Sequence, residues 1–169
     1  MARVLIIGCG CRGRALAREL IAQDHAVRGT TRAPAGLVAI EAVGAEAVLG
    51  DPDVVGTLVR SFEHVSVACV LLGSAEGPPA RLAALHGPRL AMLLARMLDT
   101  TVRGVVYEAA GSVDPDVLAA GAALVRERCE DSRIPYALLD TGPADHRAWT
   151  AAAVAAVHST LAGAPVGPR

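Results

Sequence analysis

Three glycines near the start of the chain, Gly8, Gly10 and Gly13, are spaced as G-x-G-x-x-G. A short apolar run at residues 4–7 precedes them and suits a strand that is buried on both faces. Apolar side chains then recur at helical spacing between residues 16 and 21. The glycines therefore join a strand to a helix, which is the context in which this spacing is typical of a dinucleotide-binding loop.

Each glycine of this motif has its own expected role. Gly8 permits the tight turn, Gly10 lets a pyrophosphate approach the backbone, and Gly13 lets the helix pack closely on the strand. The free N–H groups and the positive dipole end of the new helix, at Cys11 and Arg12, then face the phosphates. The alternative is a glycine-rich turn without a ligand. The strand before the turn and the amphipathic helix after it favour dinucleotide binding.

The residues after the second predicted strand, at 25–29, distinguish NAD from NADP. An Asp or Glu at this point would hold the ribose 2′-hydroxyl, whereas an arginine accommodates a 2′-phosphate. The chain carries Thr30, Thr31 and Arg32 here and no acid. A guanidinium binds a phosphate bidentately, and Arg12 in the glycine loop is placed to reach the same group. We therefore expect NADP(H) in preference to NAD(H); the alternative is that Arg32 is a solvated loop residue.

Other candidate contacts stand at the ends of later strands. Asp51 is placed either to cap the next helix or to contact the adenine, and Asp53 competes with it as the cap. Gly73 and Ser74 end the fourth predicted strand, where ligands bind in parallel sheets of this kind. The alternative for Gly73 and Ser74 is an ordinary turn.

Candidate acid–base groups follow the last two strands. Tyr107 and Glu108 end the fifth strand, and His146 lies in the first turn of the last helix. We expect these side chains to converge beside the nicotinamide, where one titratable group within hydrogen-bond reach of a substrate can act as a general acid or base. The same strand ends also carry Ser112, Asp140, Thr141 and Asp145. Structural alternatives are that Tyr107 packs in its strand and that His146 is a surface residue.

Strands alternate with helices along the whole chain. The predicted strands are 4–7, 25–29, 47–49, 64–72, 102–108 and 136–139. The predicted helices are 11–23, 34–43, 54–62, 80–98 with a break at 87–88, 117–129 and 143–161. This pattern predicts an α/β Rossmann fold with a doubly wound, parallel, six-stranded sheet of order 3-2-1-4-5-6. A single domain over residues 1–169 and a frayed tail at 163–169 are expected.

Composition excludes several classes of function. Aromatic residues make up only 2% of the chain, so few side chains are available to stack on nucleic-acid bases. The net charge of −1 gives no excess of positive charge that would attract nucleic acid or an acidic membrane. No apolar run approaches the length of a membrane span. Four cysteines and no secretion signal favour free thiols and a cytoplasmic location.

Two of the cysteines bracket the second glycine of the loop. Cys11 at a helix N-terminus could form a reactive thiolate, but a small residue between glycines is the interpretation we favour for Cys9 and Cys11. A Cys-x-Cys zinc pair would need further ligands, and the sequence has no second cluster, so no metal site is expected.

Residues 8–20 together with 25–32 resemble the start of the extended and atypical short-chain dehydrogenases/reductases, the NAD-dependent epimerase/dehydratase and NmrA-like branch. Gly50 and Asp51 resemble the adenine-contacting Gly-Asp of that family, and residues 134–143 resemble its sixth strand and the following loop, with Asp140 in place of an arginine. The resemblance implies cofactor contacts by Gly8, Gly10, Gly13, Arg32 and Asp51. It also implies a homodimer.

The chain departs from that family in two respects. All 16 basic residues are arginine, so the catalytic Tyr-x-x-x-Lys pair is missing, and the C-terminal substrate-binding part is reduced to one helix. Three functions therefore compete. The first is an NADP(H)-dependent oxidoreductase that acts on an unknown small molecule with Tyr107, Glu108 or His146 as the acid–base group. The others are an NADP(H)-binding redox sensor that signals to a regulatory protein partner, and a scaffold with a vestigial cofactor site.

Overall fold

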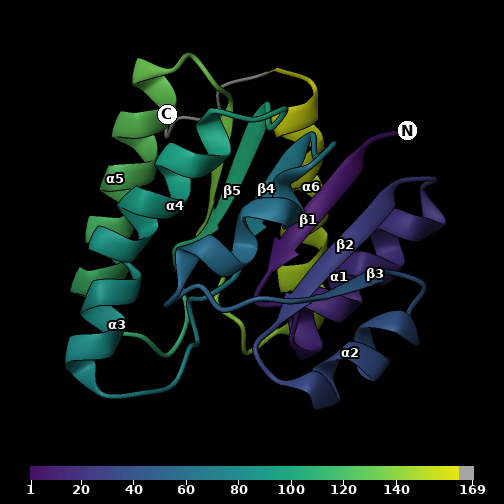
Figure 1. Ribbon diagram of the computed structural model, residues 1–169, viewed down its shortest axis with the longest axis horizontal. Coiled ribbons are helices and arrows are strands. Elements are labelled where there is room, and N and C mark those ends of the chain that lie inside the picture. Colours follow the sequence, from purple (N-terminus) through teal and green to yellow (C-terminus); the bar gives the residue numbers. More distant parts are fainter. Residues whose placement is uncertain (164–169) are drawn as a thin grey trace.

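A parallel six-stranded sheet forms the centre of the molecule, in the order β3-β2-β1-β4-β5-β6 (Figure 1). The computed structural model describes residues 1–163. The strands are β1 (Arg3–Ile7), β2 (Ala26–Thr31), β3 (Glu46–Leu49), β4 (Val67–Val70), β5 (Gly104–Glu108) and β6 (Tyr136–Leu139). The predicted fold class and strand order are confirmed.

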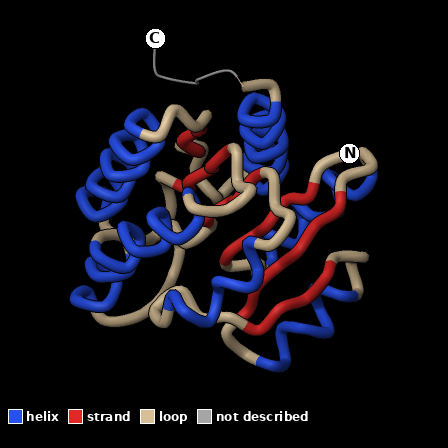
Figure 2. Tube along the Cα trace, turned by 45° about the horizontal axis from the view of Figure 1, so that its top comes forward, coloured by secondary structure: helices blue, strands red, loops and turns tan. Residues whose placement is uncertain are grey.

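Helices cover both faces of this sheet (Figure 2). They are α1 (Cys11–Ala22), α2 (Pro34–Glu41), the 3₁₀ helix η1 (Val55–Phe62), α3 (Pro79–Leu85), α4 (Pro88–Leu98), α5 (Pro115–Asp131) and α6 (His146–Leu161). Side chains of α1, α2 and α6 pack on one face, and those of η1, α4 and α5 pack on the other. The two cores share the central strands, where alternate residues point to opposite faces.

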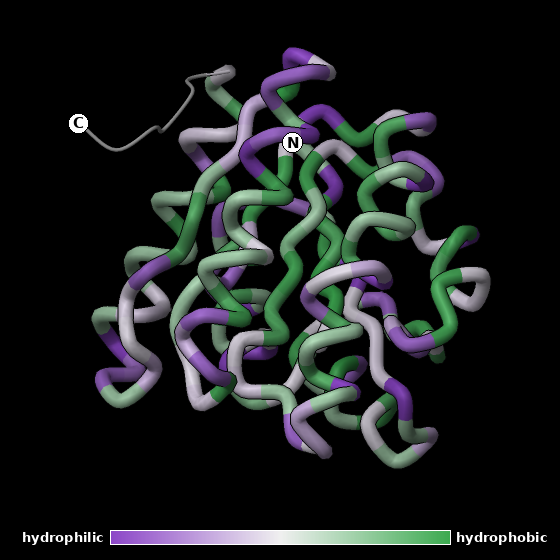
Figure 3. The backbone as a smooth tube through the Cα atoms, turned by 90° about the vertical axis from the view of Figure 1, so that its left-hand side faces the viewer, coloured by the Kyte–Doolittle hydropathy of each residue, from purple (hydrophilic) through white to green (hydrophobic). Residues whose placement is uncertain are grey.

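The central strands are buried on both faces. All four residues of β4 are buried, as are four successive residues of β1. Figure 3 shows the strongly hydrophobic stretches running through the middle of the molecule, between the helices. Continuous apolar strands of this kind are typical of parallel sheets with helices on both sides. The sheet is therefore a rigid platform, and the loops at its carboxyl edge are free to form a site.

Most predicted boundaries shift by one to three residues, and three elements differ for a clear local reason. Residues 55–62 form a 3₁₀ helix because, with three residues per turn, Val55, Leu58 and Ser61 come onto one buried face. Strand β4 cannot begin at His64, whose φ of 60° is left-handed. Helix α6 begins three residues later than predicted, where the carboxylate of Asp145 accepts a hydrogen bond from the Ala148 N–H.

The prediction that Asp53 caps the helix after β3 is wrong. No side chain caps η1, and the Asp53 carboxylate pairs with an arginine instead. Of the predicted frayed tail at 163–169, residues 164–169 lie outside the described residues. In the described part of the chain, no helix has the length and apolar character needed to cross a bilayer.

Candidate nucleotide-binding site

The glycine loop connects the carboxyl end of β1 to the first turn of α1. Gly8 has a φ of 80°, and a Cβ on it would lie 2.7 Å from the carbonyl oxygen of Leu71. A Cβ on Gly13 would lie 3.2 Å from the Ile6 side chain. The N–H groups of Gly8 and Cys9 both bond to Thr30, so the loop is tied to β2. Backbone conformation and close packing therefore require glycine at position 8, and close packing favours it at position 13.

Neither reason applies to Gly10. Its φ of −79° suits any residue, and a Cβ on it would meet no atom within 4 Å. The first turn of α1 contains no acidic side chain. Within residues 1–163, the N–H groups of Cys11, Arg12 and Gly13 have no hydrogen-bond acceptor. Free N–H groups at a helix N-terminus, facing open space, form an anion-binding site.

This space belongs to a cleft of about 370 Å³. The cleft lies at the carboxyl ends of β1, β2, β3 and β4, which include the point where the strand order reverses. Its lining residues are Gly8, Cys9, Gly10, Cys11, Arg12, Gly13, Arg14, Thr30, Thr31, Arg32, Gly36, Gly50, Pro52, Leu71, Leu72, Ser74, Ala75, Arg81 and Leu85. This lining includes four arginines and no carboxylate.

The structure brings eight of the predicted cofactor contacts to this cleft: Gly8, Gly10, Cys11, Arg12, Gly13, Thr31, Arg32 and Ser74. The other two, Asp51 and Gly73, do not line it. The Asp51 carboxylate accepts a 2.9 Å hydrogen bond from the Asp53 N–H, and the Gly73 N–H donates a 2.8 Å hydrogen bond to Glu108. Both residues thus shape the loops that border the cleft.

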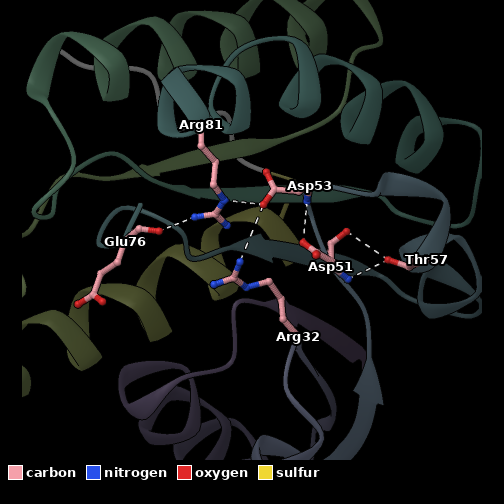
Figure 4. Close-up of polar contacts among 6 residues, drawn as sticks. All are labelled: Arg32, Asp51, Asp53, Thr57, Glu76 and Arg81. Carbon is pink, nitrogen blue, oxygen red and sulfur yellow. Dashed lines mark hydrogen bonds and ion pairs between the residues drawn. The ribbon is translucent and has the colours of Figure 1, made fainter. Parts of the chain in front are cut away.

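A pair of arginines lies at the end of the cleft next to β2 and β3 (Figure 4). Arg81 Nε donates to Asp53 Oδ2 at 2.7 Å, and Arg32 Nη1 lies 3.9 Å from the same oxygen. Arg81 is not among the contacts predicted from the sequence. No local signal marks it, because it lies in α3 and reaches the cleft only through the path of the loop after β4.

Arg12 has different partners from those predicted. Its Nη2 lies 3.1 Å from Glu108 Oε1, and its guanidinium lies over the Trp149 ring at 5.4 Å. Glu108 ends β5, on the opposite side of β1 from β2 and Arg32. The expectation that Arg12 and Arg32 share one phosphate is therefore wrong in this structure. The Arg12 Nε is buried and has no hydrogen-bond partner among the described residues.

Glu108, at the end of β5, contacts three other segments of the chain. It is completely buried, its Oε2 accepts from the Gly73 N–H, and its Oε1 accepts from Arg12 and from Trp149 Nε1 at 3.1 Å. A Cβ on Gly73 would lie 2.9 Å from the Glu108 side chain, so the β4 loop fits closely against it. Glu108 thereby fixes the glycine loop, the β4 loop and α6 relative to one another.

No protein-family model and no curated protein matches the chain, but many solved structures share its fold. A short-chain dehydrogenase/reductase superfamily protein from Agrobacterium tumefaciens with bound NAD has a TM-score of 0.67 at 21% identity, over 82% of this chain and 48% of that one. UDP-glucose 4-epimerase from Thermotoga maritima has a TM-score of 0.69 at 14% identity, over 82% and 54%. Triphenylmethane reductase from Citrobacter has a TM-score of 0.66 at 20% identity, over 82% and 48%.

The chain has the Rossmann fold of the short-chain dehydrogenases/reductases. The sequence resemblance predicted this fold, and the structural matches confirm it. The chain spans about half the length of these three proteins. At these identities the likeness concerns the fold, and the chemistry has to be argued from the residues themselves.

In this Rossmann fold the three predicted acid–base groups do not converge, so that expectation is wrong. Adjacent residues of a strand point to opposite faces. Tyr107 packs in the core beneath η1, α4 and α5, whereas Glu108 contacts Trp149 on the other face, and both are completely buried. His146 is exposed on the first turn of α6, beside a separate hollow between α1 and α6. None of the three lines the cleft. The other polar residues at these strand ends, Ser112, Asp140, Thr141 and Asp145, do not line it either.

Tyr107 forms a buried pair with His86, which is 2% exposed. His86 Nε2 lies 3.1 Å from the Leu72 carbonyl, which can only accept, so we assign the proton of the neutral ring to Nε2. The Tyr107 hydroxyl then donates to His86 Nδ1 at 2.7 Å. Burial raises the pKa of Tyr107 and lowers the pKa of His86. Through the hydrogen bond to the Leu72 carbonyl, the pair fixes the position of Leu72, which lines the cleft.

The lowered pKa of His86 predicts a pH dependence of stability. In the unfolded chain His86 takes up a proton near its ordinary pKa of 6.5, whereas in the folded chain it stays neutral to a lower pH. The free energy of unfolding is therefore highest above about pH 6.5 and decreases as the pH falls below that value. We expect the free energy of unfolding in urea to fall less between about pH 7.5 and about pH 5.5 in His86→Gln than in the unsubstituted protein. An equal fall in both proteins would contradict this assignment.

All four cysteines are free thiols, and they differ in burial. Cys9, Cys69 and Cys129 are buried, and burial raises the pKa of Cys9 to about 11. Cys11 is exposed at the cleft. Within residues 1–163, no group of three His, Cys, Asp or Glu side chains could hold a metal ion.

Proposed function

We propose that this chain binds a nicotinamide dinucleotide in the cleft at the glycine loop, NADP(H) in preference to NAD(H). The observation that carries this proposal is Gly10. Open space lies in front of it, and three unpaired N–H groups of α1 border that space. A pyrophosphate needs this close approach to the backbone. The positions of Gly8 and Gly13 are already occupied by packing contacts.

The charge of the cleft supports an anionic ligand. Its lining contains four arginines and no carboxylate, although the whole chain has a net charge of −1. Arg32 follows β2 and is 53% exposed, so its guanidinium is free to meet a phosphate. The carboxylate that would bind a ribose 2′-hydroxyl at this point is missing. This combination favours a 2′-phosphate and hence NADP(H).

The nicotinamide supplies hydride transfer when the cofactor is bound. We propose an oxidoreductase of the short-chain dehydrogenase/reductase type as the use of that chemistry. A redox sensor that binds NADP(H) without turnover is the second candidate. The sensor is favoured by the placement of Tyr107, Glu108 and His146, since none of them lines the cleft that is expected to hold the cofactor.

Calorimetric titration with NADPH, NADP, NADH and NAD tests the binding proposal. We expect Arg32→Ala to weaken the binding of NADPH about tenfold, because it removes a charge-assisted contact, and to leave NADH unchanged. Arg89→Ala, at an exposed position on α4, serves as the matched control and should bind like the unsubstituted protein. A preference for NADH would refute the NADP assignment, and failure to bind any of the four would leave the scaffold.

Turnover separates the two candidate uses. An oxidoreductase consumes bound NADPH, followed by its absorbance, when a panel of small carbonyl and imine compounds is added. A sensor shows no consumption but distinguishes NADPH from NADP in affinity. Both measurements use the protein with residues 1–169.

A further inference from the structure

Arg32 and Arg81 come from distant segments and converge on one oxygen atom, Asp53 Oδ2 (Figure 4). Arg32 follows β2, and Arg81 lies in the first turn of α3. Both arginines line the cleft, whereas Asp53 does not. The carboxylate therefore holds the arginines from outside the cleft wall, so that a ligand in the cleft meets the guanidinium groups first.

Arg81 is held more firmly than an ordinary surface arginine. Its Nε donates to Asp53, and its Nη1 donates to the Glu76 carbonyl oxygen. Gly77 packs against the same side chain, because a Cβ there would lie 2.8 Å from Arg81 Nη1. The Arg81 side chain is 24% exposed. Its guanidinium is thus fixed before any ligand arrives, which reduces the entropy that binding would cost.

Hydrogen-bond donors of the two guanidinium groups remain unused at this point. Two guanidinium groups face one carboxylate, and among residues 1–163 Arg32 has no other acceptor and Arg81 has only the Glu76 carbonyl besides Asp53. Each guanidinium has five N–H donors, so several donors remain free. A phosphomonoester carries between one and two negative charges near neutral pH and has three acceptor oxygens. Its oxygen atoms match the free donors of the two arginines.

We infer that Arg32 and Arg81 together form a subsite for a phosphomonoester, with Asp53 as the residue that positions Arg81. The inference rests on the proposed function, in which the 2′-phosphate of the adenosine is the phosphomonoester. Asp53 is not the acid that holds a ribose hydroxyl, because its Oδ2 is engaged by Arg81 and it does not line the cleft. Arg81 is then the second specificity-determining residue, one that the position of Arg32 alone does not reveal.

The test uses adenosine 2′,5′-bisphosphate and adenosine 5′-monophosphate, which differ only in the 2′-phosphate, together with NADPH and NADH. We expect Arg81→Ala to weaken the bisphosphate and NADPH about tenfold each and to leave the monophosphate and NADH unchanged. Arg81→Lys should recover part of this loss, since it restores the charge without the planar fork. Arg89→Ala again provides the control for removal of one positive charge.

Asp53→Asn separates positioning from charge. The amide oxygen can still accept from Arg81 Nε, and a negative charge beside the phosphate is removed, so the affinity ratio of NADPH to NADH should stay the same or rise. A loss of NADH binding in Asp53→Asn would overturn the inference and place Asp53 on the ribose. If Arg32→Ala lowers the NADPH to NADH ratio but Arg81→Ala does not, the inference fails and the proposed function stands. If the unsubstituted protein binds none of the four probes, the proposed function itself fails.

Discussion

Replacement of Glu108 by alanine is expected to lower the free energy of unfolding by about 3–5 kcal/mol, the usual cost of removing one partner of a buried ion pair. Glu108 is completely buried and accepts hydrogen bonds from Gly73, Arg12 and Trp149. The substitution leaves a backbone N–H and an indole N–H without partners, and it leaves the Arg12 guanidinium without its counter-ion. Unsatisfied buried donors are costly, because they have lost water and gained nothing in return.

Urea unfolding followed by the fluorescence of Trp149, the one tryptophan of the chain, measures this effect. Glu127→Ala is the matched control, since Glu127 is exposed on α5 and makes no side-chain hydrogen bond to the described residues. It should change the free energy of unfolding by less than about 0.5 kcal/mol. A loss below about 1 kcal/mol in Glu108→Ala would show that the hydrogen-bonded cluster does not hold the loops together.

Trp149→Phe probes the same cluster from the other side. Phenylalanine keeps most of the apolar packing of α6 but lacks the indole N–H that donates to Glu108. If Glu108 acts through this contact, the effects of the two substitutions will not add, and a double-mutant cycle will give a coupling of about 0.5–3 kcal/mol. Additive effects would assign the role of Glu108 to Arg12 and Gly73 alone. Circular dichroism replaces fluorescence in variants that lack the tryptophan.

The second large effect is expected at Gly10, where alanine should weaken dinucleotide binding about tenfold to a hundredfold with little change in stability. The added methyl group meets no atom within 4 Å and the φ of −79° suits alanine, so the fold has no reason to resist it. Gly10 is the N-cap of α1, and replacing this favourable N-cap residue should lower the free energy of unfolding by at most about 1 kcal/mol. The methyl group instead occupies the space in front of the free N–H groups of α1.

Gly8→Ala provides the contrast. Alanine at that position has a φ of 80° and a Cβ 2.7 Å from the Leu71 carbonyl oxygen, so it should lower the thermal midpoint of unfolding clearly. Measuring thermal unfolding and calorimetric binding of NADPH on both variants separates the two roles. If Gly10→Ala binds NADPH as tightly as the unsubstituted protein, the phosphate does not approach this loop, and the proposed site is wrong.

Much of the architecture was predictable because it depends on local patterns. Apolar runs separated by helical periodicities indicate a parallel sheet covered on both faces, and the glycine spacing at residues 8–13 locates the turn after β1. Because the carboxyl ends of parallel strands lie at the same edge of the sheet, the approximate location of the cleft was also predictable from the sequence. Eight of the ten predicted contacts therefore line it, although their role in binding remains a prediction.

Side-chain direction and long-range partners decided the rest. The alternation along β5 already indicates that Tyr107 and Glu108 face opposite sides, but which side faces a ligand depends on how α6 packs. The contact of Arg12 with Glu108 joins residues 96 positions apart, and that of Arg81 with Asp53 joins residues 28 apart. Loop paths bring such pairs together, and no local spacing encodes them. The chain's residue patterns thus specify the framework and the phosphate loop, whereas the folded arrangement assigns each charged side chain its partner.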